Sequence, residues 1–155
     1  MKSEGVEVVF CVGRGFARMV YAEADSFPET RFVLIPGRAH GGNVAGVTFV
    51  LDGAGFLAGV VAATLSGSNV GGILRGGGGP WLEDLEAGFT AGFRAQRKRG
   101  ELVTAEGADG PWRLAEQGVE VALYSADGAE EELLAAAHNA GLQLVATDPD
   151  LITLH

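Results

Sequence analysis

The chain has 155 residues, of which 47% are hydrophobic and 20% are charged, as in ordinary globular proteins. Its net charge of -9 argues against a nucleic-acid-binding protein, because neutralising phosphate groups requires a basic patch. The single cysteine, Cys11, excludes an intramolecular disulfide and a metal site built from several cysteines.

The N-terminal sequence, MKSEGVEVV, lacks the charged segment followed by an apolar one that a signal peptide has. No apolar run approaches the roughly 18 residues of a membrane-spanning helix. We therefore expect a cytoplasmic chain without membrane contact. Its length permits either one compact domain or two small lobes.

The first elements alternate between strand and helix. Val6–Val12 (VEVVFCV) is almost wholly apolar, which predicts a strand covered on both faces, as in parallel sheets. After a turn at Gly13–Gly15, a helix is predicted over Phe16–Ser26 and a strand over Arg31–Ile35. Asn43–Val50 (NVAGVTFV) alternates in polarity more than the other strands and predicts an edge or crossing strand.

A helix rich in small residues is predicted over Gly53–Leu65, with Asp52 as its N-cap. The small residues along it are Ala54, Gly55, Ala58, Gly59, Ala62 and Ala63. Because such a face permits very close packing, we expect this helix to lie between two bodies.

The clearest unit of the sequence is a strand, a glycine loop and a long helix. The strand is Val70–Leu74, and Gly76–Gly79 follow as a loop, since glycine accepts turn conformations without steric cost. Pro80 suits the first position of a helix. The apolar face of that helix is marked at steps of four by Trp81, Leu85, Phe89 and Phe93. Basic residues fill its last turn at Arg97, Lys98 and Arg99, and Gly100 is the expected C-cap.

The alternation continues to the C-terminus. Strands are predicted over Glu101–Ala105, Val119–Ser125 and Leu142–Thr147, the last of them central in its sheet. Helices are predicted over Trp112–Gln117, as a turn or brief helix, and over Ala129–Ala140, with Gly141 as its C-cap. Alternating elements of this kind predict an α/β fold with a parallel sheet and right-handed crossovers.

A short repeat relates the two halves of the chain. Gly5–Val8 and Gly118–Val121 share the letters GVEV, and each copy precedes apolar residues, a glycine-bearing turn, a helix and another apolar strand. The shared order of elements favours an internal duplication that yields two related α/β lobes. The first lobe then contains only two strands.

Residues 43–66 (NVAGVTFVLDGAGFLAGVVAATLS) and 69–93 (NVGGILRGGGGPWLEDLEAGFTAGF) resemble the basic membrane lipoprotein family. This family includes purine nucleoside receptors and belongs to the type I periplasmic-binding-protein superfamily. The resemblance runs from about Gly5 to Asp150 and implies two doubly wound lobes with a small ligand between them.

The resemblance also implies a first lobe shortened at its N-terminus, because family members have two further βα units there. We therefore divide the chain into a partial first lobe with a connecting strand and helix, residues 1–66, and a complete flavodoxin-like lobe, residues 67–155.

Polar residues at the carboxyl ends of strands are candidate ligand contacts, because ligands of α/β proteins bind there. Arg14 follows the first strand, and Asp127 and Asp148 occupy the equivalent positions in the second lobe. Each of them has an alternative role in helix capping or loop solvation. Asn43 and Trp81 complete the candidate set, although Trp81 also suits the core at the start of its helix. The resemblance implies that Asp148 accepts hydrogen bonds from sugar hydroxyls.

Other chemistry is disfavoured by the residues themselves. Gly76–Pro80 precedes a helix and could hold an anion, but Glu83 and Asp84 already satisfy the helix N-terminus, so we interpret the glycines as turn residues. No paired carboxylates, Ser-His-Asp arrangement or metal-ligand spacing can be assembled from the sequence. We therefore expect neither an enzyme nor a bound cofactor or metal.

Two functions remain. The first is a non-catalytic module that binds a small ligand, a nucleoside or sugar by the resemblance. The second is an interaction or regulatory protein that keeps the fold, has lost ligand binding and assembles as a dimer. A two-stranded first lobe leaves sheet edges and an apolar face uncovered. We expect a second copy or a partner chain to cover them, with the helix Gly53–Leu65 at the junction.

Overall fold

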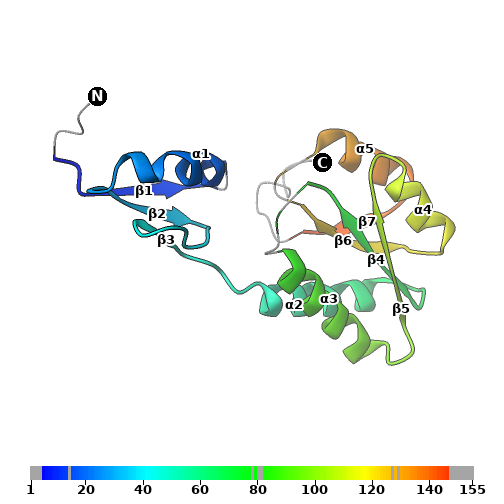
Figure 1. Ribbon diagram of the computed structural model, residues 1–155. Coiled ribbons are helices and arrows are strands. Elements are labelled where there is room, and N and C mark those ends of the chain that lie inside the picture. The colour runs from blue at the N-terminus through cyan, green and yellow to red at the C-terminus, as the bar shows by residue number, and fades with distance from the viewer. Residues whose placement is uncertain are drawn as a thin grey trace. The chain divides into compact units, whose positions relative to one another are not determined.

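The computed structural model describes residues 5–13, 15–77, 79, 82–126, 128 and 130–146. The chain divides into two compact units, Met1–Phe49 and Val50–His155. Each unit is built on its own parallel sheet with packed helices, which confirms the predicted α/β class (Figure 1). Within the described ranges, no helix is long and apolar enough to cross a bilayer.

The first unit is a three-stranded parallel sheet covered on one face by a helix. Its strands, in spatial order, are β1 (Val8–Val12), β2 (Arg31–Ile35) and β3 (Val44–Gly46). Helix α1 (Phe16–Glu23) and the 3₁₀ turn η1 (Ala24–Ser26) connect β1 to β2. The small core of this unit consists of Cys11, Val20, Ala24, Leu34 and Val44.

The opposite face of this sheet is apolar and exposed. On β1, the side chains of Val8, Phe10 and Val12 are 43%, 66% and 66% exposed. They belong to one face because side chains alternate along a strand, and the residues between them point to the core. Val33 and Ile35 of β2 extend this face, since they pair in register with Phe10 and Val12.

The first unit has three strands where the sequence predicts two. β3 pairs with β2 at the edge of the sheet, which confirms an edge strand within Asn43–Val50, although it is only three residues long. The next helix packs with the second unit. The units therefore separate between Phe49 and Val50, whereas the sequence places the boundary between residues 66 and 67.

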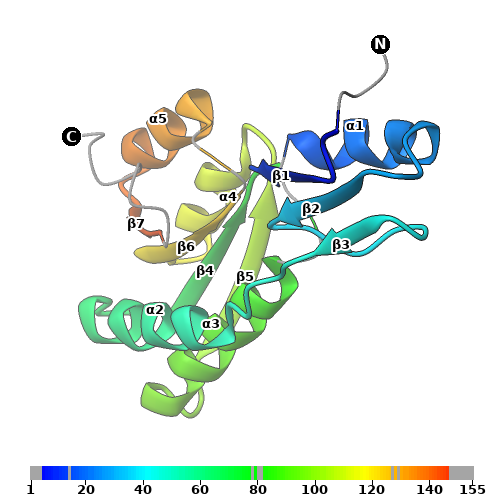
Figure 2. The same ribbon diagram turned by 90° about the vertical axis from the view of Figure 1, so that its left-hand side faces the viewer.

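The second unit is a four-stranded parallel sheet with helices on both faces (Figures 1 and 2). Its strands, in spatial order, are β5 (Glu101–Glu106), β4 (Val70–Arg75), β6 (Val121–Ser125) and β7 (Gln143–Val145). One face is covered by α2 (Asp52–Leu65) and α3 (Leu82–Gln96). The other is covered by α4 (Gly110–Glu116) and α5 (Glu131–Asn139). The prediction of a central last strand is wrong, because β7 is short and lies at the edge.

Helices α2 and α3 meet backbone to backbone. A methyl group added at Gly55 would lie 2.1 Å from the carbonyl oxygen of Leu85, and one at Gly59 would lie 2.2 Å from that of Phe89. The reciprocal glycines of α3 are Gly88 and Gly92. The predicted close packing of the small-residue helix is therefore present, but its partner is α3 of the same unit.

The basic residue that follows α3 forms hydrogen bonds with the end of α2. The helix ends at Gln96, and the next residue, Arg97, sends Nη2 to the carbonyl oxygens of Ala63 and Ser66 at 3.1 and 2.7 Å. This cation thus satisfies the end of α2, whereas the sequence assigns it to the end of its own helix. Gly100 is not the C-cap, because its amide donates to the Arg97 carbonyl in a following turn.

Two further cap predictions concern the end of α5 and the start of α2. Ala140 is the C-cap of α5, and Gly141, which the sequence predicts as the C-cap, follows it one position later with φ +76°. Asp52 is not the N-cap of α2 but its first residue, and Leu51 takes the cap position.

The repeated tetrapeptide has the same structure in both units. Gly5 and Gly118 both have positive φ, +71° and +79°. The carbonyl oxygen of Glu7 accepts a hydrogen bond from the first amide of β2 at 2.8 Å, and that of Glu120 accepts one from the first amide of β7 at 2.9 Å. The two copies begin equivalent βαβ units, which supports the predicted duplication.

Candidate functional site

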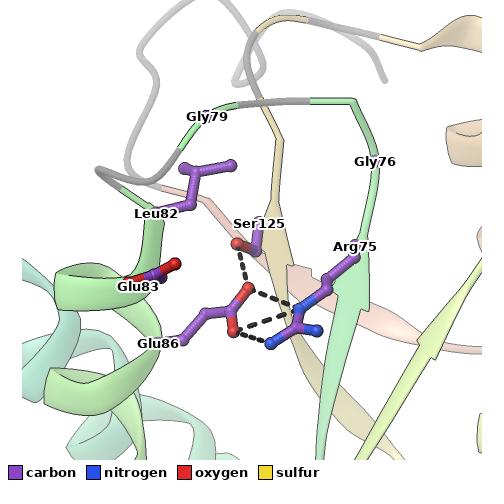
Figure 3. A pocket seen from close by; sticks show the side chains of 7 residues that line it. All are labelled: Arg75, Gly76, Gly79, Leu82, Glu83, Glu86 and Ser125. Carbon is purple, nitrogen blue, oxygen red and sulfur yellow. Dashed lines mark hydrogen bonds and ion pairs between the residues drawn. The ribbon is translucent and has the colours of Figure 1, made fainter.

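Strands β4 and β6 end side by side, and a hollow lies at their carboxyl ends. Arg75, the last residue of β4, pairs in register with Ser125, the last residue of β6. The volume of the hollow is about 340 Å³, within the range of small-molecule sites. Its lining, shown in Figure 3, consists of Arg75, Gly76, Gly79, Leu82, Glu83, Glu86 and Ser125. Ligands of α/β proteins bind at this end of the sheet.

A nearly buried carboxylate organises the hollow. Glu86 on α3 is 9% exposed, and its carboxylate lies between the side chains of Arg75 and Ser125 (Figure 3). Arg75 Nε donates to Oε1 at 2.9 Å and to Oε2 at 3.1 Å, and Nη2 also donates to Oε2. The buried Ser125 hydroxyl donates to Oε1 at 2.8 Å. Glu86 thereby joins one helix to two strands.

These hydrogen bonds favour the charged forms of both groups. Burial has the largest effect on the pKa of Glu86 and raises it, but the hydrogen bonds from Arg75 and Ser125 outweigh burial and bring that pKa below its usual value. The hydrogen bond to Glu86 raises the pKa of the Arg75 guanidinium. The pair is therefore ionic at neutral pH.

Two amides of the glycine loop beside the hollow, those of Gly76 and Gly77, already have acceptors. The Gly76 amide donates to the Ser125 carbonyl at 3.0 Å, and the Gly77 amide donates to the carboxylate of Glu130. The first amide of α3 donates to the carbonyl of Gly79 at 3.1 Å. This supports the interpretation of these glycines as turn residues.

The hollow carries more negative than positive charge. Arg75 is the one cation in its described lining, and Glu86 balances it. The carboxylates of Glu106 and Glu83 also act on the Arg75 guanidinium and raise its pKa. Carboxylates accept hydrogen bonds from hydroxyl and amino groups. In the part of the chain that the structure describes, no three His, Cys, Asp or Glu side chains are placed to hold a metal ion.

A comparison with protein families decides the assignment. Residues 1–151 match the family described as PnrA-like ABC transporter substrate-binding proteins, or Bmp. The chain belongs to this family. The match confirms the resemblance to basic membrane lipoproteins seen in the sequence. No curated protein matches the chain.

Solved structures share the fold of this substrate-binding family member. A transcriptional activator of the comK gene from Bacillus halodurans is 24% identical, with a TM-score of 0.68 over 91% of this chain and 52% of its own. An ABC transporter system solute-binding protein from Aeropyrum pernix K1 is 20% identical, with a TM-score of 0.67 over 90% and 45%. A Mycobacterium smegmatis protein in complex with β-D-fucofuranose is 15% identical, with a TM-score of 0.53 over 92% and 55%. The chain thus spans about half the length of these structures, and the likeness shows the type I periplasmic-binding-protein-like fold alone.

One of the five candidate ligand residues lies in the described part of the chain. The side-chain Nδ2 of Asn43 donates to the carbonyl oxygens of Ala24, Phe27 and Thr30 at 2.9, 3.0 and 3.0 Å. It therefore ties the turn before β2 to the start of β3, which is a structural role. The other four, Arg14, Trp81, Asp127 and Asp148, lie outside the described residues, and their ligand contacts stay predictions.

Arg75, Glu86 and Ser125 were not among the residues predicted from the sequence to contact a ligand. The sequence does mark two of them as candidate ligand contacts, because Arg75 and Ser125 are polar residues that end apolar strands. The strand-end rule that selected the other candidates applies to both. Glu86 carried a weaker signal, a charged residue beside the apolar face of α3, and only the packing of that helix shows its partners.

A second hollow, in the first unit, is less suited to a ligand of this family. Its volume is about 450 Å³, and its lining consists of Gly5, Val6, Glu7, Val8, Glu29, Thr30 and Arg31. These residues lie at the amino ends of β1 and β2, whereas α/β proteins bind ligands at the carboxyl ends.

Proposed function

We propose that the chain is a non-catalytic binding module for a small hydroxyl-bearing molecule, a nucleoside or a sugar. The observation that carries this proposal is the hollow at the ends of β4 and β6, with the hydrogen-bonded Arg75–Glu86–Ser125 network in its wall. Ion pairs and hydroxyl groups at a strand end supply directional hydrogen bonds to a bound molecule.

The family assignment supports the same function, because its members are substrate-binding proteins of transporters. The Mycobacterium smegmatis protein that shares the fold was solved with a furanose sugar. Asp148 and Asp127 are proposed to accept hydrogen bonds from ligand hydroxyls, as the resemblance implies for Asp148.

A panel of nucleosides, nucleobases and sugars is expected to contain a molecule that raises the melting temperature. At ten times its Kd, such a ligand adds about 1.4 kcal/mol to the free energy of unfolding. Thermal shift with the intact chain measures this effect. Asp148→Ala is expected to abolish the shift, and the matched variant Asp109→Ala, in an exposed ion pair outside the hollow, is expected to keep it. A panel in which no molecule shifts the transition contradicts the proposal.

Self-association is the second proposed property, and the open face of the first sheet favours it. Val8, Phe10 and Val12 form an exposed apolar surface on β1, which is also an edge strand. A second copy of the chain bound there would cover the apolar surface and pair with the open strand edge. The alternative function, an interaction protein without a ligand, rests on the same surface.

Sedimentation velocity at micromolar concentration is expected to show a dimer. Phe10→Glu places a charge on the open face and is expected to yield a monomer. Met19→Glu is the matched control, because Met19 is 55% exposed on α1, which covers the other face of the sheet. A well-folded monomer of the unmodified chain contradicts self-association.

A further inference from the structure

We propose that Arg75 is the ligand-orienting residue of the hollow at β4 and β6, and that this hollow selects uncharged hydroxyl-bearing molecules over their phosphorylated counterparts. This inference rests on the proposed small-molecule binding function. It adds a binding residue, Arg75, and a charge rule, which is the preference for neutral molecules over phosphorylated ones.

Glu86 fixes the orientation of the Arg75 guanidinium. Nε and Nη2 of Arg75 are both held by Glu86, so one edge of the planar group is fixed. The hydrogen bonds of Arg75 with other described residues involve Nε and Nη2 and leave the third nitrogen, Nη1, without a described partner. The Arg75 side chain is 47% exposed and that of Glu86 is 11% exposed, so the open part of the pair belongs to Arg75. A guanidinium fixed along one edge is preorganised to donate hydrogen bonds from its free nitrogen to an acceptor atom of a ligand.

Carboxylates outnumber cations around the Arg75 guanidinium. Arg75 is neutralised by Glu86, and Glu83 lines the same hollow from the first turn of α3. The carboxylate of Glu106 also acts on Arg75. A phosphate group would therefore meet carboxylates that no described cation in the lining balances, and like charges placed together weaken binding strongly.

Backbone amides of a loop before a helix hold phosphates in other α/β proteins. Here the amide of Gly77 is taken by the carboxylate of Glu130, and that of Gly76 by a strand carbonyl. Two donors that an anion would use are thus occupied from within the protein. A hydroxyl group needs no such cradle, because a single hydroxyl both accepts a hydrogen bond, as from the Arg75 guanidinium, and donates one, as to a carboxylate of the lining.

Matched pairs of molecules test the charge rule. Isothermal titration of the unmodified chain with adenosine and adenosine monophosphate, and with ribose and ribose 5-phosphate, is expected to show the neutral member of a pair binding about tenfold or more tightly. Glu83→Gln is expected to narrow that ratio. A phosphorylated molecule that binds as tightly as its neutral counterpart overturns the inference and leaves the proposed binding function intact.

Variants of Arg75 test its role in orientation. Arg75→Lys keeps the positive charge beside Glu86 but removes the planar donor edge, and we expect it to weaken binding of the neutral ligand about tenfold or more. Arg75→Gln combined with Glu86→Gln removes the ion pair without leaving a lone buried charge, and the same loss is expected. Arg94→Gln, at an exposed position of α3, is the control and is expected to bind normally.

The outcomes distinguish the orienting role of Arg75 from the binding function itself. If neutral molecules bind and Arg75→Lys binds them as tightly as the unmodified chain does, the orienting role is wrong while the binding function stands. If neither these molecules nor any member of the thermal-shift panel binds, the orienting role and the binding function fail together.

Discussion

Gly59→Ala is expected to lower the free energy of unfolding by about 3 kcal/mol, at the upper end of overpacking costs. The added methyl group would lie 2.2 Å from the Phe89 carbonyl oxygen and 2.6 Å from the Phe93 amide nitrogen. Both obstacles are backbone atoms of α3, so no side-chain rotation relieves the contact. The helices would have to separate, and this would open the core around Phe89, which is fully buried.

The same substitution six residues earlier supplies the control. Gly53 also lies in α2, but a methyl group added there meets nothing within 4 Å. Gly53→Ala is therefore expected to be neutral or to stabilise by up to about 1 kcal/mol, because alanine favours the helix. Urea unfolding of both variants measures the difference. Equal stability of the two would show that α2 and α3 do not approach as closely as described.

Local patterns were sufficient to predict most elements of the fold. Arg31–Ile35 is a strand with the predicted bounds, and the apolar residues Leu85, Phe89 and Phe93 face the core as their spacing of four requires. These features depend on periodicity within a single element. For the same reason the small residues of α2 correctly indicated close packing.

The partner of each element was harder to predict, because it depends on contacts far apart in the sequence. The small residues of α2 carry no information about which surface they touch, and the partner is α3. The basic residue Arg97 likewise follows one helix but caps another. The last strand is as apolar as a central strand, yet β7 lies at an edge because of the order in which the sheet is assembled.

The candidate site shows the same limit. Arg75 and Ser125 are 50 positions apart and become neighbours only through the register of β4 and β6. The strand-end rule identifies that edge of the sheet as the place to search. It does not reveal that a carboxylate from α3 reaches the same point, since Glu86 looks like a surface residue of an amphipathic helix.

Arg75→Leu is expected to lower the free energy of unfolding by about 2 kcal/mol. Removing one partner of a buried ion pair typically costs 3–5 kcal/mol, and the half-exposed position of Arg75 reduces that value. The variant leaves the carboxylate of Glu86 nearly buried, with only the hydrogen bond from Ser125 among those described. Arg75→Leu with Glu86→Leu removes the charge as well, so we expect the double variant to regain most of the loss. Urea unfolding of the four proteins in this cycle measures the coupling.

The pH dependence of the same cycle identifies Glu86 as the source of the coupling. Its pKa is lowered in the folded protein, so the stability that it contributes is fully present above its unfolded pKa, about 4.3, and is lost as the pH falls through the folded pKa. In Arg75→Leu, burial is the dominant influence and favours the protonated carboxyl instead. The gap in stability between the unmodified chain and Arg75→Leu is therefore expected to shrink as the pH falls from the raised Glu86 pKa of the variant, above about 4.3, through the lowered Glu86 pKa of the unmodified chain. A gap that stays constant over this range, or a double variant no more stable than Arg75→Leu, would show that Glu86 is not held as an ion pair.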